Sequence, residues 1–244
     1  MFGGLRADDV GSRLLPVVIH ALLAASLALT SLPAQATVNA PRSVDCSRVK
    51  CLALTFDDGP GEYTPALLKT LRKAGAKATF FLVGERVEKS PKVAKEILAQ
   101  GHAIGNHTYS HAALPALLDY EILDELKVNQ EVIEKATGLR PKMYRPPYGQ
   151  TDERVLRVAY QAELAEILWT GTTLDWSLRD TKKIKAVVLK LAQRDGVILM
   201  HDVVPQTVKV MPEILKELKK QGYHLVTVPT LMRAKGLKAG TSYF

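Results

Sequence analysis

Two histidines and two aspartates carry the residue types and spacing of a metal-dependent hydrolytic site. His107 and His111 are four positions apart, so on one helical turn both imidazoles would face the same way and grip one cation. Asp57 and Asp58 are adjacent, and one carboxylate can bind the cation while the other points at its water. Plainer interpretations exist, since histidine pairs occur on solvated helix faces and Asp-Asp-Gly-Pro is good turn chemistry. Together, the four residues predict a facial triad with open coordination positions.

Further polar clusters follow short apolar runs: the Arg-Pro-Pro-Tyr-Gly segment at 145–149, Asp175 with Trp176, and His201 with its acidic neighbour. In a parallel α/β barrel the carboxyl ends of the strands meet at one face, where active sites are built. We therefore expect these clusters to converge on the histidines and aspartates. Taken singly, Arg145 could form a surface ion pair, Trp176 could belong to the core, and His201 could sit in a capping pair.

Short apolar runs alternate with amphipathic stretches along the chain, and these are the elements that must position the clusters. The predicted strands are 52–56, 78–83, 103–106, 143–145, 165–170, 197–201 and 224–228, and the predicted helices are 65–74, 91–100, 120–137, 152–160, 181–193 and 207–221. Such alternation predicts an α/β fold with a parallel sheet covered on both faces. Seven repeats suffice to close, or nearly close, a barrel. An open doubly wound sheet is the alternative, although no Gly-rich phosphate loop follows the first strand.

The N-terminus has the pattern of an export signal. Arg6 and Arg13 precede an apolar run over 14–33, and an Ala-Gln-Ala sequence ends at Ala36. We predict a signal peptide at 1–36, a linker at 37–50, a folded domain over 46–231 and a C-terminal tail at 232–244. An uncleaved membrane anchor is the alternative, because the apolar run is long for a signal.

Composition bounds the class of protein and its partners. The chain has 244 residues, of which 47% are hydrophobic and 24% charged, as expected of one globular domain. Lys and Arg outnumber Asp and Glu by 33 to 25, and this excess favours anionic partners. For an exported protein, the expected anionic partner is a wall polymer and not nucleic acid.

Cys46 and Cys51 are the two cysteines of the chain. Outside the cytoplasm they can oxidise to a disulfide, which would stabilise so small a loop by about 2 kcal/mol. A zinc pair and two free thiols are the alternatives, but no companion Cys or His lies nearby in sequence to complete a zinc site. We predict a disulfide at the entry to the first strand.

Five motifs, in order, resemble those of the polysaccharide deacetylases, which are carbohydrate esterase family four with its NodB homology domain. The motifs are Thr-Phe-Asp-Asp-Gly-Pro at 55–60, His-Thr-Tyr-Ser-His at 107–111, Arg-Pro-Pro-Tyr at 145–148, Asp-Trp at 175–176 and Leu-Met-His at 199–201. The resemblance spans roughly 52–229. It implies a distorted (β/α)7 barrel in a single domain and one divalent cation, commonly zinc, with cobalt or manganese in some members.

The resemblance also implies roles for individual residues. Asp58, His107 and His111 would hold the metal. Asp57 would be the general base, paired with Arg145. The backbone N–H of Tyr148 would help to hold the oxyanion.

His201 would be the general acid in the same scheme, oriented by Asp175. Leu199 and Trp176 would line the pocket for the acetyl methyl group and a sugar face. One departure from the family pattern concerns substrate placement: Thr172 stands where the family often has an aspartate.

These observations predict a secreted, cell-wall-associated, monomeric deacetylase without a stable membrane anchor after signal cleavage. Its substrate would be an acetylated polysaccharide, most simply the N-acetylglucosamine units of peptidoglycan. Chitin or chitooligosaccharide deacetylation and acetylxylan esterase activity are alternatives with the same chemistry. A non-catalytic carbohydrate-binding protein and a metal phosphoesterase are alternatives of other classes.

Overall fold

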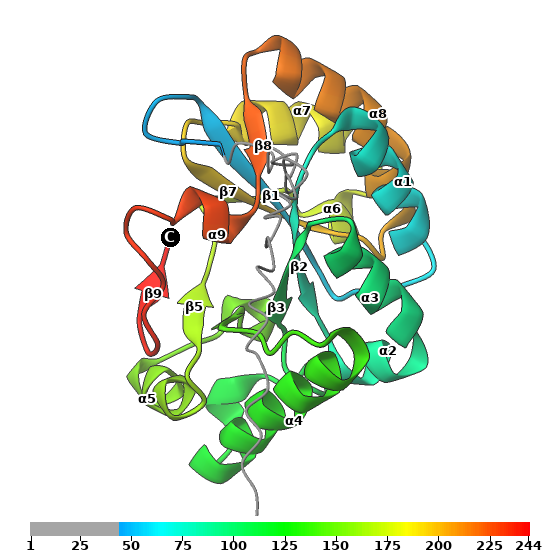
Figure 1. Cartoon of the computed structure of the whole chain (residues 1–244). Helices are drawn as coiled ribbons and strands as arrows, with labels where there is room; N and C mark the ends of the chain where they lie inside the picture. Colours follow the sequence, from blue (N-terminus) through cyan, green and yellow to red (C-terminus); the bar gives the residue numbers. More distant parts are fainter. Residues whose placement is uncertain (1–43) are drawn as a thin grey trace, which may run out of the picture. The chain divides into compact units, whose positions relative to one another are not determined.

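The structure is a computed structural model, and it describes residues 44–244 (Figure 1). The predicted signal peptide and residues 37–43 of the predicted linker lie outside the described residues. Within residues 44–244, no helix is both long enough and apolar enough to cross a bilayer.

One parallel sheet forms the centre of the fold. The strands are β1 (Cys51–Asp57), β2 (Thr79–Leu82), β3 (Ala103–Asn106), β4 (Met143–Tyr144), β5 (Ala165–Ile167), β6 (Gly171–Thr172), β7 (Gly196–His201), β8 (His224–Val226) and β9 (Ser242–Tyr243). Their order is β6-β7-β1-β2-β3-β4-β5-β9, and β8 pairs with β1 off this path. Every pairing is parallel. The strands curl into a half-barrel, which confirms the predicted α/β class.

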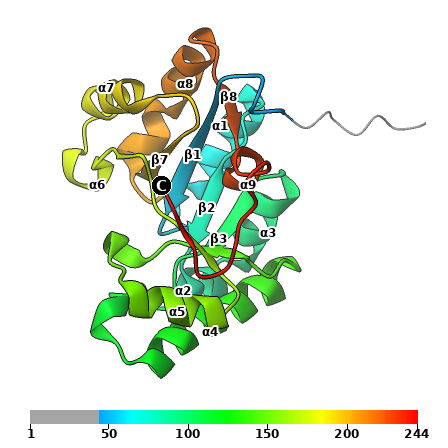
Figure 2. The ribbon, with the colours of Figure 1, turned by 90° about the vertical axis from the view of Figure 1, so that its left-hand side faces the viewer.

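Helices lie around the outside of the curled sheet (Figures 1 and 2). They are α1 (Thr64–Ala74), α2 (Gly84–Lys89), α3 (Pro91–Ala99), α4 (Asp119–Thr137), α5 (Glu153–Gln161), α6 (Asp175–Leu178), α7 (Thr181–Leu191), α8 (Pro205–Lys220) and α9 (Val228–Leu231), with short 3-10 turns η1 (Leu114–Ala116) and η2 (Pro147–Gly149). The six predicted helices agree with α1, α3, α4, α5, α7 and α8 to within two residues at each end. The helices α2, α6 and α9 were not predicted, because they are too short to show a helical period.

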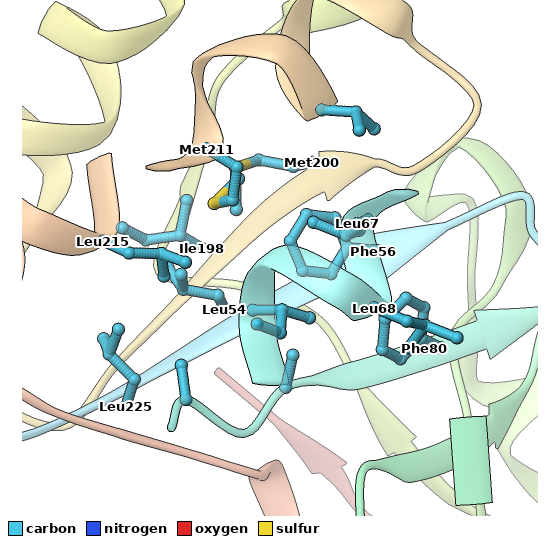
Figure 3. Packing of buried hydrophobic residues seen from close by; sticks show 14 of the residues in the cluster. Leu54, Phe56, Leu67, Leu68, Phe80, Ile198, Met200, Met211, Leu215 and Leu225 are labelled. Carbon is cyan, nitrogen blue, oxygen red and sulfur yellow. The ribbon is translucent and has the colours of Figure 1, made fainter. Parts of the chain in front are cut away.

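Packing of β1 against α1 and α8 fixes which side chains face the barrel interior. Leu54 and Phe56 of β1 join Leu67 and Leu68 of α1 in the core cluster shown in Figure 3, with Met211 and Leu215 of α8 close by. Because side chains alternate along a strand, Thr55 and Asp57 point the opposite way, into the barrel. The apolar face of β1 therefore sets the direction of its polar face.

The C-terminal residues belong to the fold, so the segment at 232–244 that we predicted to be a C-terminal tail is not separate from it. Ser242 and Tyr243 form β9, which pairs in parallel with β5. The Ser242 hydroxyl also donates to the buried carboxylate of Glu166 at 2.7 Å, and the hydroxyls of Tyr144 and Thr151 donate to the same carboxylate. A two-residue strand beside polar neighbours lacks the apolar run on which strand prediction depends.

The disulfide prediction is confirmed, because Cys46 and Cys51 are joined at the entry to β1. The bond ties the first described residues to β1, the strand that pairs with β2, β7 and β8.

His102, directly before β3, is a buried histidine, 3% exposed, whose Nδ1 accepts a hydrogen bond from the Ala78 N–H at 3.2 Å. Burial lowers the pKa of His102 to about 4, and the charge of Lys77 adds to the effect. Because the folded-state pKa lies below that of the unfolded chain, the associated stability is present at neutral pH. It is lost as the pH falls from the unfolded value, about 6.5, toward 4.

We therefore expect the free energy of unfolding of the wild type to fall between pH 7 and pH 5 by about 2 kcal/mol more than that of His102→Asn. The asparagine Oδ1 can accept the same hydrogen bond but does not titrate. Urea unfolding at both pH values is the measurement. His224→Asn, which removes an exposed histidine from β8, is the matched control and should behave like the wild type. Equal pH dependence in all three proteins would contradict the assignment.

Candidate functional site

A cavity of about 470 Å³ opens at the carboxyl ends of the strands. It is lined by Asp57, Asp58, His107, His111, Pro146, Tyr148, Gly149, Trp169, Thr172, Leu174, Trp176, Leu199 and His201. Apart from the two cysteines, only two sequence-predicted site residues are missing from this lining, Arg145 and Asp175. Both are fully buried beside the cavity. The strands therefore bring the separate polar clusters together as the barrel topology predicts.

Asp58, His107 and His111 form one candidate metal-binding group, with all ligating atoms within 4.8 Å of one another. The Nε2 atoms of His107 and His111 lie 3.4 and 3.1 Å from Oδ1 of Asp58. The predicted helical turn between the histidines is wrong, because 107–111 is an irregular loop in which Thr108 and His111 both have positive φ. Backbone turns, and not a helix, aim the two rings at the same point.

The chemistry of this group fits a cation. Asp58 Oδ1 is buried without a hydrogen-bond partner in the described part of the chain. His107 Nδ1 lies 2.7 Å from the carbonyl oxygen of Arg145, so it carries the proton and leaves Nε2 free to bind. Burial alone would raise the pKa of Asp58, but its close polar contacts with His107 and His111 and the charge of His107 and His201 outweigh burial and lower that pKa strongly. The carboxylate is therefore ionised, as a metal ligand must be.

Asp57, at the end of β1, is held by a buried guanidinium. Arg145 Nη1 donates to Asp57 Oδ1 at 2.8 Å and to the Thr55 hydroxyl at 2.7 Å. Its remaining nitrogens donate to the carbonyl oxygens of Ile167 and Leu168. Arg145 is 0% exposed, and its guanidinium lies over the ring of Phe81. Asp57 thus keeps a fixed orientation beside the metal group.

His201, at the end of β7, is paired with a buried carboxylate. Its Nδ1 lies 2.7 Å from Oδ1 of Asp175, while Oδ2 of Asp175 accepts from the His201 backbone N–H and from the Thr207 hydroxyl. Burial opposes the charge of His201, but hydrogen bonding and charge from Asp175 outweigh it and raise the pKa of His201 to about 9. The imidazole is therefore protonated at neutral pH in the chain as described.

The sequence model that describes the family "Polysaccharide deacetylase" matches residues 45–167 of this chain, which contain β1 to β5 and both halves of the metal group. The chain belongs to the polysaccharide deacetylase family. It is therefore of the class of hydrolases that cleave carbon–nitrogen bonds in acetylated polysaccharides. This confirms the resemblance seen in the five motifs.

Relatives of known activity share the fold and much of the sequence. A peptidoglycan-N-acetylglucosamine deacetylase of Bacillus cereus is 37% identical over 187 residues, covering 75% of this chain and 68% of the relative. The peptidoglycan-N-acetylmuramic acid deacetylase PdaC of Bacillus subtilis is 38% identical, covering 84% of this chain and 42% of the relative. The solved structure of T48 deacetylase with substrate is 40% identical with a TM-score of 0.79, covering 82% of this chain and all of that one.

Apolar and aromatic side chains form the walls of the deacetylase cavity. Leu199 is 6% exposed, whereas Trp176 and Tyr148 are 55% and 67% exposed. Tyr148 has positive φ, and in the described chain no protein oxygen accepts its backbone N–H, which is left for a ligand. Trp169, whose ring lies against the Arg145 guanidinium, was not predicted to be a site residue. Its position just after a buried strand is the sequence signal that could have indicated it.

Asp202 and Thr64 were also missed as part of the deacetylase site. The Thr64 hydroxyl donates to Asp202 Oδ2 and accepts from the Gly61 N–H at 2.8 Å. Asp202 is fully buried, and burial raises the pKa of this carboxyl to about 7. A Cβ at Gly59 would collide with the same carboxylate. The pair therefore clamps the turn after Asp57 against the strand that carries His201.

Thr64→Val should lower the free energy of unfolding by about 1–3 kcal/mol, since it leaves two buried polar groups unpaired. It should also lower the rate of deacetylation at temperatures where the variant is folded, because the turn that carries Asp57 and Asp58 loses its anchor. Thr70→Val is the control on the same helix, where the hydroxyl bonds only the Ala66 carbonyl. Thermal unfolding and acetate release are the measurements. A Thr64→Val enzyme as stable and as fast as Thr70→Val would contradict the clamp.

Proposed function

We propose that this chain is an exported, metal-dependent deacetylase that hydrolyses the acetamido group of N-acetylglucosamine units in peptidoglycan. The observation that carries the proposal is the three-residue ligand group beside a second carboxylate, Asp57, that Arg145 holds in place. The Bacillus cereus relative, named for this activity, supports the substrate. The signal-like sequence at 1–36 and the cell-wall substrate of that relative support export and action in the wall.

Asp58, His107 and His111 would hold one divalent cation in this proposal. Two imidazoles and one carboxylate favour zinc, with cobalt and manganese as alternatives. A cation bound there supplies a Lewis acid that polarises the acetyl carbonyl and acidifies the attacking water.

The chain's own residues would divide the proton transfers. Asp57 takes the proton of the attacking water, and Arg145 keeps the carboxylate aimed at it. The backbone N–H of Tyr148 donates to the acetyl oxygen as negative charge develops there. His201, protonated and oriented by Asp175, gives its proton to the leaving nitrogen. This splits the acid and base roles between two groups on neighbouring strands, β1 and β7.

The cavity walls fit an acetylated sugar. Leu199, which lines the cavity, would receive the acetyl methyl group, and the exposed ring of Trp176 would offer a flat surface to a sugar face. Apolar contact of this kind orients a neutral substrate without using charge.

We expect the purified chain with zinc to release acetate from peptidoglycan, and Asp57→Asn to lower the rate by at least about a hundredfold, as loss of a general base does. Asp57→Asn should keep the zinc-dependent rise in thermal stability, whereas Asp58→Asn should lose both activity and that rise. Acetate release and thermal unfolding with and without zinc are the measurements. Near-normal turnover by Asp57→Asn would show that another group is the base. Release of acetate from chitooligosaccharide or acetylxylan, but not from peptidoglycan, would contradict the proposal that peptidoglycan is the substrate.

PdaC supports a second candidate substrate, the N-acetylmuramic acid unit of the same polymer. Digestion of the treated peptidoglycan and mass analysis of its disaccharides would identify which sugar has lost its acetyl group. Deacetylated muramic acid with intact glucosamine would favour this candidate over the first.

The pH dependence of the reaction tests the acid. Since His201 must be protonated to act, activity should be lost as the pH rises through its pKa. Asp175→Asn removes the group that raises the pKa of His201, so the alkaline limb of kcat/KM should move to lower pH by about one unit or more. Asp180→Asn, at the N-cap of α7 and able to cap it still, is the control and should keep the wild-type profile. An unmoved alkaline limb in Asp175→Asn would mean that His201 is not the acid.

A further inference from the structure

Net positive charge is concentrated on one layer of helices. Helix α1 carries three Lys or Arg residues, α7 carries four, and neither has an acidic residue. Helix α8 carries four lysines and two glutamates, and it packs against both α1 and α7. Helix α4, away from this layer in Figures 1 and 2, has the reverse balance of six acidic residues to two lysines. The excess positive charge of the protein is therefore gathered on the α1, α7 and α8 layer.

A groove of about 470 Å³ lies between α1 and α8 within this layer. It is lined by Lys69, Thr70, Lys73, Ala74, Pro212, Leu215, Lys216 and Lys219. Lys69 and Lys73 stand one turn apart on one wall, and Lys216 and Lys219 stand one turn apart on the other. All four are exposed. The groove thus presents two short rows of ammonium groups to solvent.

These ammonium groups are largely unneutralised. Among the residues that the structure describes, none of the four lysines has a carboxylate within 4.0 Å, whereas Lys185 of α7 pairs with Glu213. Lys219 donates to the carbonyl oxygen of Ala74 at the end of α1. The other three are not bonded to any protein acceptor over residues 44–244. Like charges held close together in this way favour an anionic ligand.

The shape of the groove selects among anionic ligands. A groove with cations on both walls can surround a single extended chain, whereas a flat bilayer would meet only its rims. Interfacial membrane binding also uses exposed aromatic or large apolar side chains, and the exposed ones of the described chain lie outside α1 and α8. Lysine ammonium groups are common phosphate binders that act as point charges, and the planar guanidinium fork that pairs with carboxylates and phosphates alike is not part of this lining.

We propose that the groove between α1 and α8 binds a linear polyphosphodiester chain, of the kind that an anionic wall polymer presents. The groove involves the second half of each helix. Since helices in this topology begin at the carboxyl edge of the sheet and run back, those halves lie near its amino edge. The bound chain therefore leaves the catalytic cavity open and holds the enzyme beside its substrate. The groove residues are separate from the catalytic ones, so binding does not depend on the proposed chemistry.

The test uses the full chain and synthetic poly(glycerol phosphate). Lys69→Gln, Lys73→Gln and Lys216→Gln are combined, and Lys219 is kept because of its bond to Ala74. The matched control combines Lys92→Gln, Lys95→Gln and Lys127→Gln, which removes the same charge from α3 and α4. We expect the wild type to bind with an affinity that falls as salt rises, the groove variant to bind at least about tenfold more weakly, and the control to stay within about twofold.

Two results with the polymer would overturn the proposal: no binding by the wild type, or an equal loss in the control variant, which would indicate a response to net charge alone. Anionic vesicles of phosphatidylglycerol distinguish the other source of phosphate. A groove variant that loses vesicle binding but keeps polymer binding would also overturn it, in favour of a membrane surface. Acetate release from chitooligosaccharide should be unchanged in the groove variant. This activity serves as a folding control that does not depend on polymer binding.

Discussion

The site depends on one buried cation, the guanidinium of Arg145. A fully buried charge is costly unless every donor is paired, so its partners are constrained in position. Those partners are the Asp57 carboxylate, the Thr55 hydroxyl and two carbonyl oxygens at the end of β5, those of Ile167 and Leu168. The carbonyl oxygen of Arg145 itself accepts from His107. One residue therefore fixes both the proposed base and the tautomer of a proposed metal ligand, and a shift in either would leave a buried polar group unpaired.

The same residue explains why the outer strands matter to the chemistry. Arg145 reaches β5 through its side chain. Strand β5 is held in turn by its pairing with β9 and by the bond that the Ser242 hydroxyl donates to the carboxylate of Glu166 on β5. A barrel that curls without closing leaves its edge strands to be held by local bonds. The C-terminal residues provide such bonds, so a segment remote from the cavity supports the strand on which Arg145 depends.

Much of the site was predictable from sequence because its residues follow buried strands. Leu52 to Phe56 is an apolar run, and the topology of a parallel sheet then places Asp57 and Asp58 at the shared edge. What sequence did not predict is local geometry. His107 and His111 have helical spacing, yet positive φ angles at Thr108 and His111 direct the chain into a loop. A period of four fits a helix and this loop equally well, so only the backbone distinguishes them.

The clamp formed by Thr64 and Asp202 escaped prediction for another reason. The two residues are 138 positions apart, and neither belongs to a pattern with a period. Thr64 reads as an ordinary first residue of a helix, and Asp202 as a polar neighbour of His201. The adjacency arises only because β1 and β7 pair in parallel with Asp57 opposite His201. Contacts fixed by strand register in this way require the topology before they can be inferred.

The position of charge on the molecule separates two kinds of recognition. Around the cavity mouth the exposed groups are apolar or aromatic, namely Tyr148, Leu174 and Trp176. Thr172 also lines the cavity and adds a hydroxyl without charge. A mouth of this kind suits a neutral acetylated sugar, which is oriented by ring faces and shape. The net charge of the chain cannot contribute to that contact, because it lies largely on α1, α7 and α8. The basic groove between α1 and α8 therefore acts, in our proposal, on a separate anionic polymer that lies beside the substrate.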